Sequence, residues 1–364
     1  MNTNNNKNRN TNNNINRTTK PSNRTNFTPR KSEKAKSGIN YKFVITQVAI
    51  ILVLSVVISL LLFLPGNKSL ISGIATPPQA LAQSSYVDSM SKVDNSFMIT
   101  SLSTEIDSKS AILTDLASGE VLAQKFPDEK VYPASLTKIM TATLVLEHFN
   151  DLQQEIEMPS DMYVYLLEQN ASQAGFLAGE KVKIIDLLYG VLLPSGADAC
   201  LALARTVAGT EQNFAKQMTE KAKELGAENT NFVNSTGLHD DNHYSTVRDL
   251  SCILAYALKN ETFKTIFTTE RYTTSPTNKH TKGLTLTNTT FKAFERAKIE
   301  NVYVKGGKTG FTGEACLCLA SLAMREGREY TLVTVGAGSS TSSRGTQHVQ
   351  DADLIYNSID KYLK

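Results

Sequence analysis

Cysteine is scarce in this sequence, with four residues among 364, which excludes a small scaffold that depends on disulfide bonds. An overall excess of one charge is also missing. Lys and Arg number 38 against 35 Asp and Glu, a net charge of +3, and this balance excludes a uniformly basic protein that coats nucleic acid. Apolar residues make up 41% and charged residues 20% of the chain, a composition that excludes a wholly disordered protein.

The charges are divided unevenly along the chain. Residues 1–42 hold ten Lys or Arg and one acidic residue, Glu33, a local charge of +9, so the rest of the chain carries −6. Residues 1–28 are rich in Asn and contain almost nothing apolar, so this segment cannot bury enough surface to offset its ordering entropy. We therefore expect residues 1–42 to form a disordered basic tail, with no nucleic-acid partner implied.

A long apolar run follows the tail. Residues 43–64 carry no charged side chain, and as a helix they would span the roughly 30 Å hydrocarbon core of a bilayer. This length favours an uncleaved signal anchor, although cleavage of a secretory signal after Ala82 stays open as an alternative. The Lys and Arg that precede the run predict a cytoplasmic N-terminus and place residues 65–364 outside the cytoplasm.

The rest of the chain divides into a stalk and a folded region. Residues 65–104 are rich in Ser, Pro and Ala without periodicity, and residues 105–364 are long enough for one large domain. Hairpins near both ends with helices between them predict an α+β fold whose first and last strands share one sheet. The expected strands are Ala111–Asp115, Glu120–Gln124, Val302–Lys305, Ala315–Met324 and Tyr330–Ala337, and the expected helices are Leu136–Phe149, Ile184–Leu193, Ala199–Val207, Glu211–Leu225, Val247–Leu258 and Val349–Leu363.

One nucleophile candidate stands at the start of the first expected helix. Positions i and i+3 share a helix face, so Lys138 can reach the hydroxyl of Ser135 and remove its proton. The spacing Ser-x-x-Lys is weak evidence alone, since it recurs at Ser89–Lys92 and Ser358–Lys361. It becomes specific only in combination with other motifs of the chain.

Two further short motifs stand C-terminal to it. Ser195-Gly196-Ala197 lies in the break between two expected helices, and Lys308-Thr309-Gly310 comes after the expected strand Val302–Lys305. Ser-x-x-Lys, Ser-Gly-x and Lys-Thr-Gly, in this order on the exported side, form a specific combination found in penicillin-binding proteins and class A β-lactamases.

With these motifs the chain resembles the serine D-Ala-D-Ala carboxypeptidases, the low-molecular-mass penicillin-binding proteins of peptidase family S11. The resemblance runs from about Ser110 to the C-terminus. It implies a penicillin-binding or β-lactamase-like fold, with an antiparallel sheet flanked by helices and a mostly helical lobe. The longer strings that carry it are PASLTKIMTA from Pro133, LLYGVLLPSG from Leu187, NSTGLH from Asn234 and HYSTVRDL from His243.

The resemblance implies catalytic roles for four residues. Ser135 matches the nucleophile that becomes acylated, and Lys138 matches the base that activates it. Ser195 matches the serine that passes a proton to the leaving amine, and Lys308 matches the cation that sets the electrostatics of the site. The implied substrate is a peptidoglycan stem peptide ending in D-Ala-D-Ala, with β-lactams as covalent inhibitors. No metal and no cofactor are implied.

It also implies a substrate-binding set. Thr309 and Gly310 belong to the Lys-Thr-Gly motif, and the hydroxyl of Thr309 matches the one that holds the terminal carboxylate of the substrate. The backbone N–H groups of Ser135 and Phe311 match an oxyanion hole. Arg344 stands where the family often places an arginine that helps to bind the carboxylate.

One position departs from the family pattern. The second motif usually ends in Asn, whose amide bonds to the peptide backbone of the substrate, and here it ends in Ala197. Loss of the Asn amide is expected to cost about 1–3 kcal/mol of transition-state binding if nothing replaces that amide. Activity itself is expected to survive, because the groups that transfer protons are all present.

The sequence leaves alternative functions open. A class A β-lactamase would need a deacylating Glu near residues 229–231, where the chain has Asn229, Thr230 and Asn231. A penicillin-binding scaffold without activity would fit the loss of the Asn, and endopeptidase or transpeptidase action on wall crosslinks is a variant of the carboxypeptidase interpretation. His243 is expected to be structural, and all four cysteines are expected to be buried free thiols.

Overall fold

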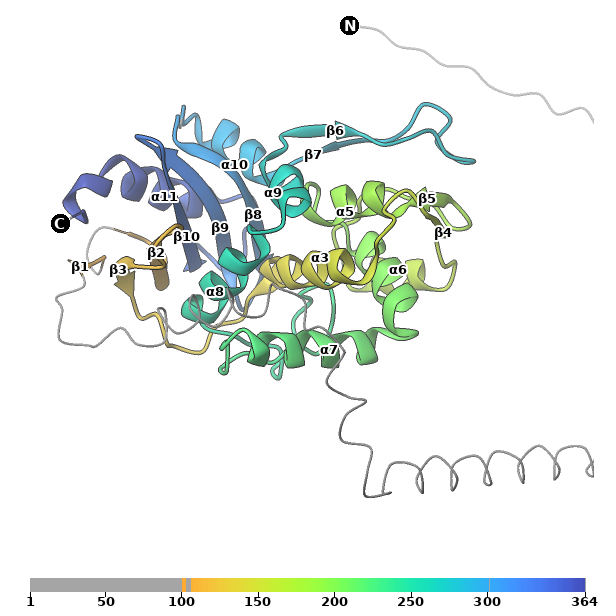
Figure 1. The fold of residues 1–364 in the computed structure, drawn as a ribbon, viewed down its shortest axis with the longest axis horizontal. Coiled ribbons are helices and arrows are strands. Elements are labelled where there is room, and N and C mark those ends of the chain that lie inside the picture. The colour runs from red at the N-terminus through yellow and green to blue at the C-terminus, as the bar shows by residue number, and fades with distance from the viewer. Residues whose placement is uncertain (1–99, 103–105, 301, 364) are drawn as a thin grey trace, which may run out of the picture. The chain divides into compact units, whose positions relative to one another are not determined.

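A six-stranded sheet forms the centre of the fold. The structure is a computed structural model that describes residues 100–102, 106–300 and 302–363. The strand order of the sheet is β1-β3-β2-β10-β9-β8, and every neighbouring pair is antiparallel except the parallel pair β1 and β3. Because β2 pairs with β10, hairpins from both ends of the folded region share one sheet, as predicted (Figure 1). The strands are β1 Thr100–Ser101, β2 Ser110–Asp115, β3 Val121–Lys125, β8 Val304–Thr312, β9 Cys316–Arg325 and β10 Arg328–Ala337.

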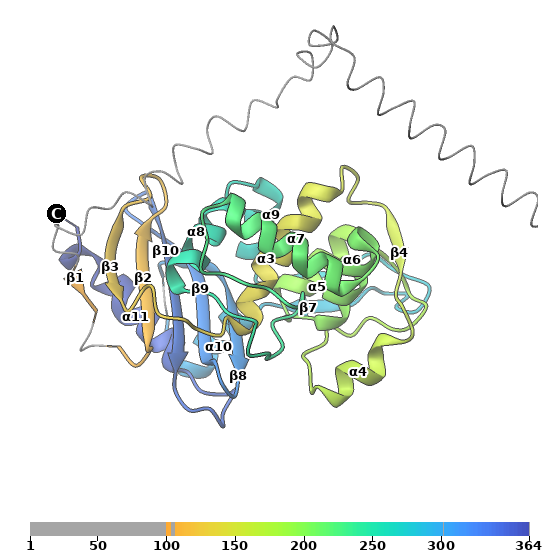
Figure 2. The same cartoon turned by 90° about the horizontal axis from the view of Figure 1, so that it is seen from below.

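Helices cover both faces of this sheet, so its central strands are buried on both sides. Successive residues of a strand face opposite sides, and Leu332 therefore packs with one cluster of apolar side chains while Val333 packs with the other. The first cluster is completed by α10 (Thr289–Ala297) and α11 (Gln347–Asn357), and the second by α8 (Val247–Ala257) and the helical lobe (Figure 2).

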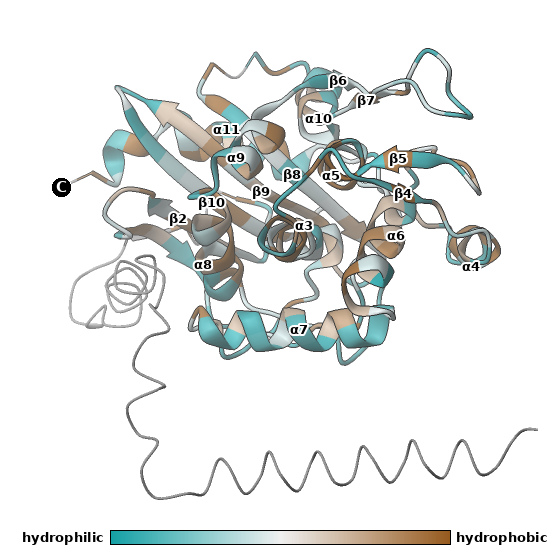
Figure 3. Cartoon of the chain, turned by 45° about the vertical axis from the view of Figure 1, so that its right-hand side comes forward, coloured by the Kyte–Doolittle hydropathy of each residue, from teal (hydrophilic) through white to brown (hydrophobic). Residues whose placement is uncertain are grey.

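The helical lobe follows the first hairpin and surrounds the buried helix α3, whose apolar colouring at the centre of the lobe is visible in Figure 3. Two small antiparallel ribbons, β4 with β5 and β6 with β7, complete the fold. The elements are α3 Thr137–His148, β4 Glu155–Glu157, α4 Met162–Glu168, β5 Lys181–Lys183, α5 Ile184–Leu192, α6 Ala197–Ala208, α7 Glu211–Glu224, α9 Glu261–Thr268, β6 Arg271–Thr273 and β7 Thr285–Thr287.

Two expected boundaries were wrong. The strand expected to end at Lys305 continues as β8 to Thr312, so Lys308-Thr309-Gly310 lies within a strand rather than after one. Its glycines concealed the strand in the sequence pattern. Gly306 is required, because a Cβ atom there would lie 2.3 Å from the carbonyl oxygen of Phe267. The C-terminal helix ends at Asn357 and is followed by a short 3-10 turn over Ile359–Lys361.

The tail, the predicted span at residues 43–64 and nearly all of the predicted stalk lie outside the described residues. Among the residues that the structure describes, no helix has the length and apolar character needed to cross a bilayer.

Candidate active site

Ser135 lies in a 3-10 turn, Ala134–Leu136, that leads directly into α3. One helical turn later, the Nζ atom of Lys138 donates a hydrogen bond to the hydroxyl of Ser135 at 3.0 Å. A second bond, 2.5 Å long, runs from Nζ to the carbonyl of Thr236. The predicted contact between Lys138 and Ser135 is therefore present, and their catalytic roles stay a prediction.

Two lysines are buried at this site. Lys138 is 2% exposed and Lys308 is fully buried, with its Nζ atom 2.7 Å from the carbonyl of Thr309. Burial lowers the pKa of Lys138 below the usual lysine value, since the charged form loses its hydration. The pKa of Lys308 lies well below that value, because of burial and then the charge of Lys138. A lysine that is easily deprotonated is suited to accept the proton of a serine.

Ser195 occupies the break between α5 and α6, as predicted, and lines the same cleft as Ser135 and Lys138. Its backbone is in the left-handed region, with φ of +66°, which costs a non-glycine residue about 1 kcal/mol. Its buried hydroxyl has no hydrogen-bond partner among the described residues, whereas its carbonyl accepts a bond of 2.6 Å from Ser172. An unpaired buried hydroxyl in a cleft is available to a bound substrate.

Three backbone segments meet around Ser135. A Cβ atom on Gly310 of β8 would lie 3.1 Å from the nitrogen of Ser135. A Cβ atom on Gly237, whose φ is +78°, would lie 1.9 Å from the carbonyl oxygen of Ala134. Glycine is required at Gly237 on both counts. These contacts bring β8 alongside the 3-10 turn, so that Phe311 and Ser135 line one cleft.

Thr309 and Gly310 line the cleft beside Phe311, as predicted. The hydroxyl of Thr309 donates a hydrogen bond to the hydroxyl of Thr289, the first residue of α10, at 2.6 Å. The cleft has a volume of about 840 Å³, large enough for a peptide segment.

Ala197 is the first residue of α6, is 1% exposed and lines the cleft. The neighbouring carboxylate does not replace the missing amide. Asp198 accepts bonds from the N–H groups of Ala174 (2.8 Å), Gly175 (3.0 Å) and Phe176 (3.2 Å), so it is turned into the loop before β5. Asp198 thus holds residues 174–176 beside the start of α6.

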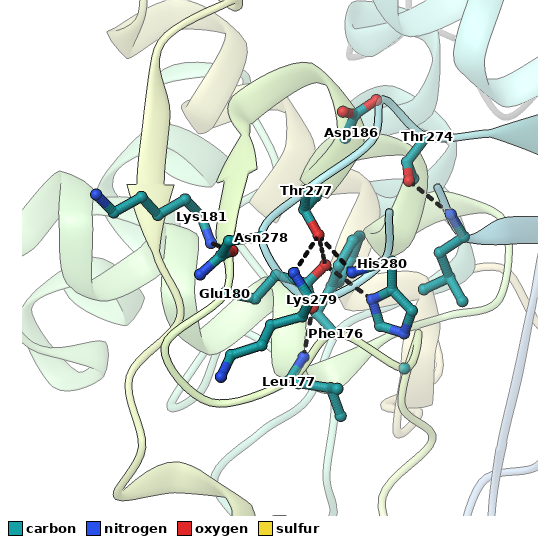
Figure 4. Close-up of polar contacts among 12 residues, drawn as sticks. Phe176, Leu177, Glu180, Lys181, Asp186, Thr274, Thr277, Asn278, Lys279 and His280 are labelled. Atoms are coloured by element: carbon teal, nitrogen blue, oxygen red, sulfur yellow. Dashed lines mark hydrogen bonds and ion pairs between the residues drawn. The ribbon is translucent and has the colours of Figure 1, made fainter. Parts of the chain in front are cut away.

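A second buried carboxylate holds the same loop further along. Glu180 is fully buried, and its carboxylate accepts a bond from the N–H of Leu177 at 2.7 Å. It also contacts the hydroxyl of Thr277 at 2.6 Å and Nδ1 of His280 at 2.8 Å, both from the segment between β6 and β7 (Figure 4). Glu180 therefore links this loop to the segment between β6 and β7.

Arg344 is exposed in the segment between β10 and α11 and does not line the cleft, although its neighbour Ser343 does. The cleft instead contains two cations that the sequence pattern did not reveal, Lys292 and Arg296 of α10. Their spacing of four residues is a helical signal, but the helix itself was not predicted.

His243 has a structural position, as expected. It is 2% exposed, its Nε2 lies 2.7 Å from the hydroxyl of Thr137, and its Nδ1 accepts a bond from the N–H of Val233. All four cysteines are buried free thiols, which confirms that expectation. Asn229 and Thr230 donate hydrogen bonds to the carboxylate of Asp249, and neither lines the cleft.

Comparison with known proteins agrees with this geometry. A model of the D-alanyl-D-alanine carboxypeptidase family, Peptidase S11, matches residues 97–339. The chain belongs to this family. It is 33% identical over 257 residues to the D-alanyl-D-alanine carboxypeptidase DacF of Bacillus subtilis, covering 70% of this chain and 64% of that relative. A D-alanyl-D-alanine carboxypeptidase of Streptomyces strain K15 is 35% identical over 66% of this chain and 82% of its own length.

Solved structures give the same assignment. The crystal structure of the Streptomyces K15 DD-transpeptidase superposes with a TM-score of 0.62 and 32% identity, covering 69% of this chain and 96% of that one. Penicillin binding protein 5 from Haemophilus influenzae gives a TM-score of 0.60 and 26% identity, covering 70% and 72%. The predicted α+β penicillin-binding fold is confirmed.

The lowered pKa of Lys138 predicts how reactivity depends on pH. If neutral Lys138 is the base, the rate at which a fluorescent penicillin acylates Ser135 should rise with pH and should level off below the ordinary lysine pKa. Stopped-flow fluorescence measures this rate. Lys138→Arg, whose guanidinium stays protonated, should be slower by about 10²–10⁴-fold. A flat wild-type profile, or a midpoint at the ordinary lysine pKa, would contradict the assignment.

Proposed function

We propose that this chain is a serine-type D-Ala-D-Ala carboxypeptidase that removes the terminal D-Ala from peptidoglycan stem peptides and binds penicillin covalently. The observation that carries the proposal is the contact of 3.0 Å between the Nζ atom of buried Lys138 and the hydroxyl of Ser135. Membership of the carboxypeptidase family supports the substrate class.

The first half of the reaction forms an acyl-enzyme. Neutral Lys138 takes the proton of Ser135, whose oxygen attacks the carbonyl carbon of the penultimate D-Ala. The N–H groups of Ser135 and Phe311 stabilise the oxyanion, and the C–N bond then breaks. Ser195 passes a proton to the departing amine, which leaves as D-Ala.

The second half returns the enzyme to its starting state. Water, deprotonated through the same lysine, hydrolyses the ester on Ser135 and releases the shortened stem peptide. The hydroxyl of Thr309 holds the terminal carboxylate of the substrate in place, and Lys308 sets the electrostatics of the site. Arg344 is proposed to assist from its exposed loop. Ala197 leaves one substrate amide without its usual partner, which lowers the rate without removing the proton-transfer groups.

Release of D-Ala from a stem peptide that ends in D-Ala-D-Ala tests this function. The full chain should release D-Ala and should be labelled by a fluorescent penicillin, whereas Ser135→Ala should lose both activities. Ser358→Ala, a serine with the same Ser-x-x-Lys spacing far from the cleft in sequence, is the matched control. Labelling without D-Ala release would indicate a scaffold, and rapid turnover of penicillin without a stable adduct would indicate a β-lactamase.

We also propose that residues 105–364 work outside the cytoplasm, tethered by a membrane span at residues 43–64 and a stalk at 65–104. The uncharged run and the excess of Lys and Arg before it support this arrangement. In cells expressing the full chain, the protein should sediment with membranes and should be cut by protease added to spheroplasts. Deletion of residues 43–64 should abolish both results, and resistance of the intact chain to the protease would contradict the proposed orientation.

A further inference from the structure

Two cations of α10 line the cleft without an acidic partner. Lys292 and Arg296 are four residues apart, so they lie on one face of the helix. Within the part of the chain that the structure describes, neither side chain has a hydrogen bond or an ion pair. Other surface cations do find partners; Arg205, for example, pairs with Asp161 at 2.8 Å. The positive charge on α10 is therefore available to a ligand.

The place of α10 relates these cations to the reaction. Its first residue, Thr289, accepts the hydrogen bond from Thr309, the residue proposed to hold the terminal carboxylate. Lys292 and Arg296 follow Thr289 by three and seven positions, or about 5 and 10 Å along the helix. The cationic surface therefore begins where the leaving group is held and continues beyond it.

A buried histidine completes the same region of the cleft. His348 of α11 lines the cleft, is only 2% exposed, and its Nδ1 atom has no hydrogen-bond partner among the described residues. Burial and then the charge of Arg296 lower its pKa to about 4, so the ring is neutral near pH 7. An unpaired buried ring nitrogen is costly, and a bound polar group would offset the cost.

We propose that Lys292, Arg296 and His348 form a second anion subsite, which binds a further carboxylate on the leaving-group side of the substrate. Free D-Ala has one carboxylate, and Thr309 already accounts for it. A cross-linked stem peptide has a larger leaving group, because the departing amine belongs to a neighbouring stem peptide with carboxylates of its own. This proposal rests on the proposed function and extends it to cleavage of crosslinks.

The chemistry needs no additional reactant. The oxygen of Ser135 forms an ester with the carbonyl of the donor D-Ala, while the C–N bond to the neighbouring stem peptide breaks and its amine leaves with a proton. Water then hydrolyses the ester, as in release of D-Ala. Only the leaving group differs, and it would occupy the cleft beside α10.

The test compares two substrates on the full chain: a linear stem peptide ending in D-Ala-D-Ala, and a cross-linked dimer of that peptide. The readout is the ratio of the two kcat/KM values, cross-linked over linear. Lys292→Gln and Arg296→Gln should each lower this ratio about tenfold, the effect of losing one charge-assisted hydrogen bond. Lys292→Arg, which keeps the positive charge, should retain the wild-type ratio. Lys282→Gln removes an exposed cation outside the cleft and should leave the ratio unchanged.

The outcomes separate this inference from the proposed function. If the wild-type chain cleaves the linear peptide and leaves the dimer intact, or if the α10 variants keep the wild-type ratio, the second subsite is wrong and the carboxypeptidase stands. If neither peptide is cleaved and penicillin does not label Ser135, the proposed function itself fails and this inference fails with it.

Discussion

Burial of two lysine side chains, one of which is affected by the charge of the other, is the constraint on which the rest of the site depends. Lys138 and Lys308 are both removed from water, and each Nζ atom has a backbone carbonyl as acceptor, that of Thr236 or that of Thr309. An ammonium group is expensive to bury, and two near each other are more so, which favours loss of a proton. A neutral amine beside Ser135 is the chemical requirement for nucleophilic attack.

The surrounding backbone packs closely around these residues. Gly237 allows the segment before Leu238 to approach the turn at Ser135 more closely than any side chain would permit, and Gly310 keeps β8 close to the nitrogen of Ser135. Asp198 and Glu180 take the place of water as hydrogen-bond partners of N–H groups in the loop before β5. Fixed surroundings of a buried base reduce the reorganisation needed when charge develops during the reaction.

Much of this arrangement could be predicted from the sequence, and the misses have identifiable causes. Hydrophobic periodicity predicted α7 and α8, and the caps at Thr210 and Thr246 are present, with each hydroxyl accepting an N–H bond from three residues ahead. Motif order predicted one site for Ser135, Ser195 and the Lys308-Thr309-Gly310 motif, although nothing local in the sequence connects them. Ser135, Ser195, Thr309 and Gly310 line one cleft, while the buried Lys308 does not. This arrangement depends on β8 pairing in the sheet, a long-range contact that periodicity does not encode.

The helix α10 was missed although its sequence carries a local signal, an amphipathic pattern that follows the N-cap Asn288, whose side chain accepts a hydrogen bond from the N–H of Thr290. The family resemblance pointed to Arg344 rather than to the cations Lys292 and Arg296. The role of Asp198 was also hidden, because its three N–H partners lie more than twenty residues earlier in the chain. Tertiary placement, rather than local propensity, determines what these residues do.

The central claim is that burial lowers the pKa of Lys138, the proposed base, and an NMR titration of the full chain with ¹³C-labelled lysine side chains tests it most directly. The signal of Lys138, assigned by its loss in Lys138→Arg, should titrate at a pKa below the ordinary lysine value of about 10.4. A signal that titrates at or above that value would contradict the account, because the base beside Ser135 would then be a permanently charged ammonium group.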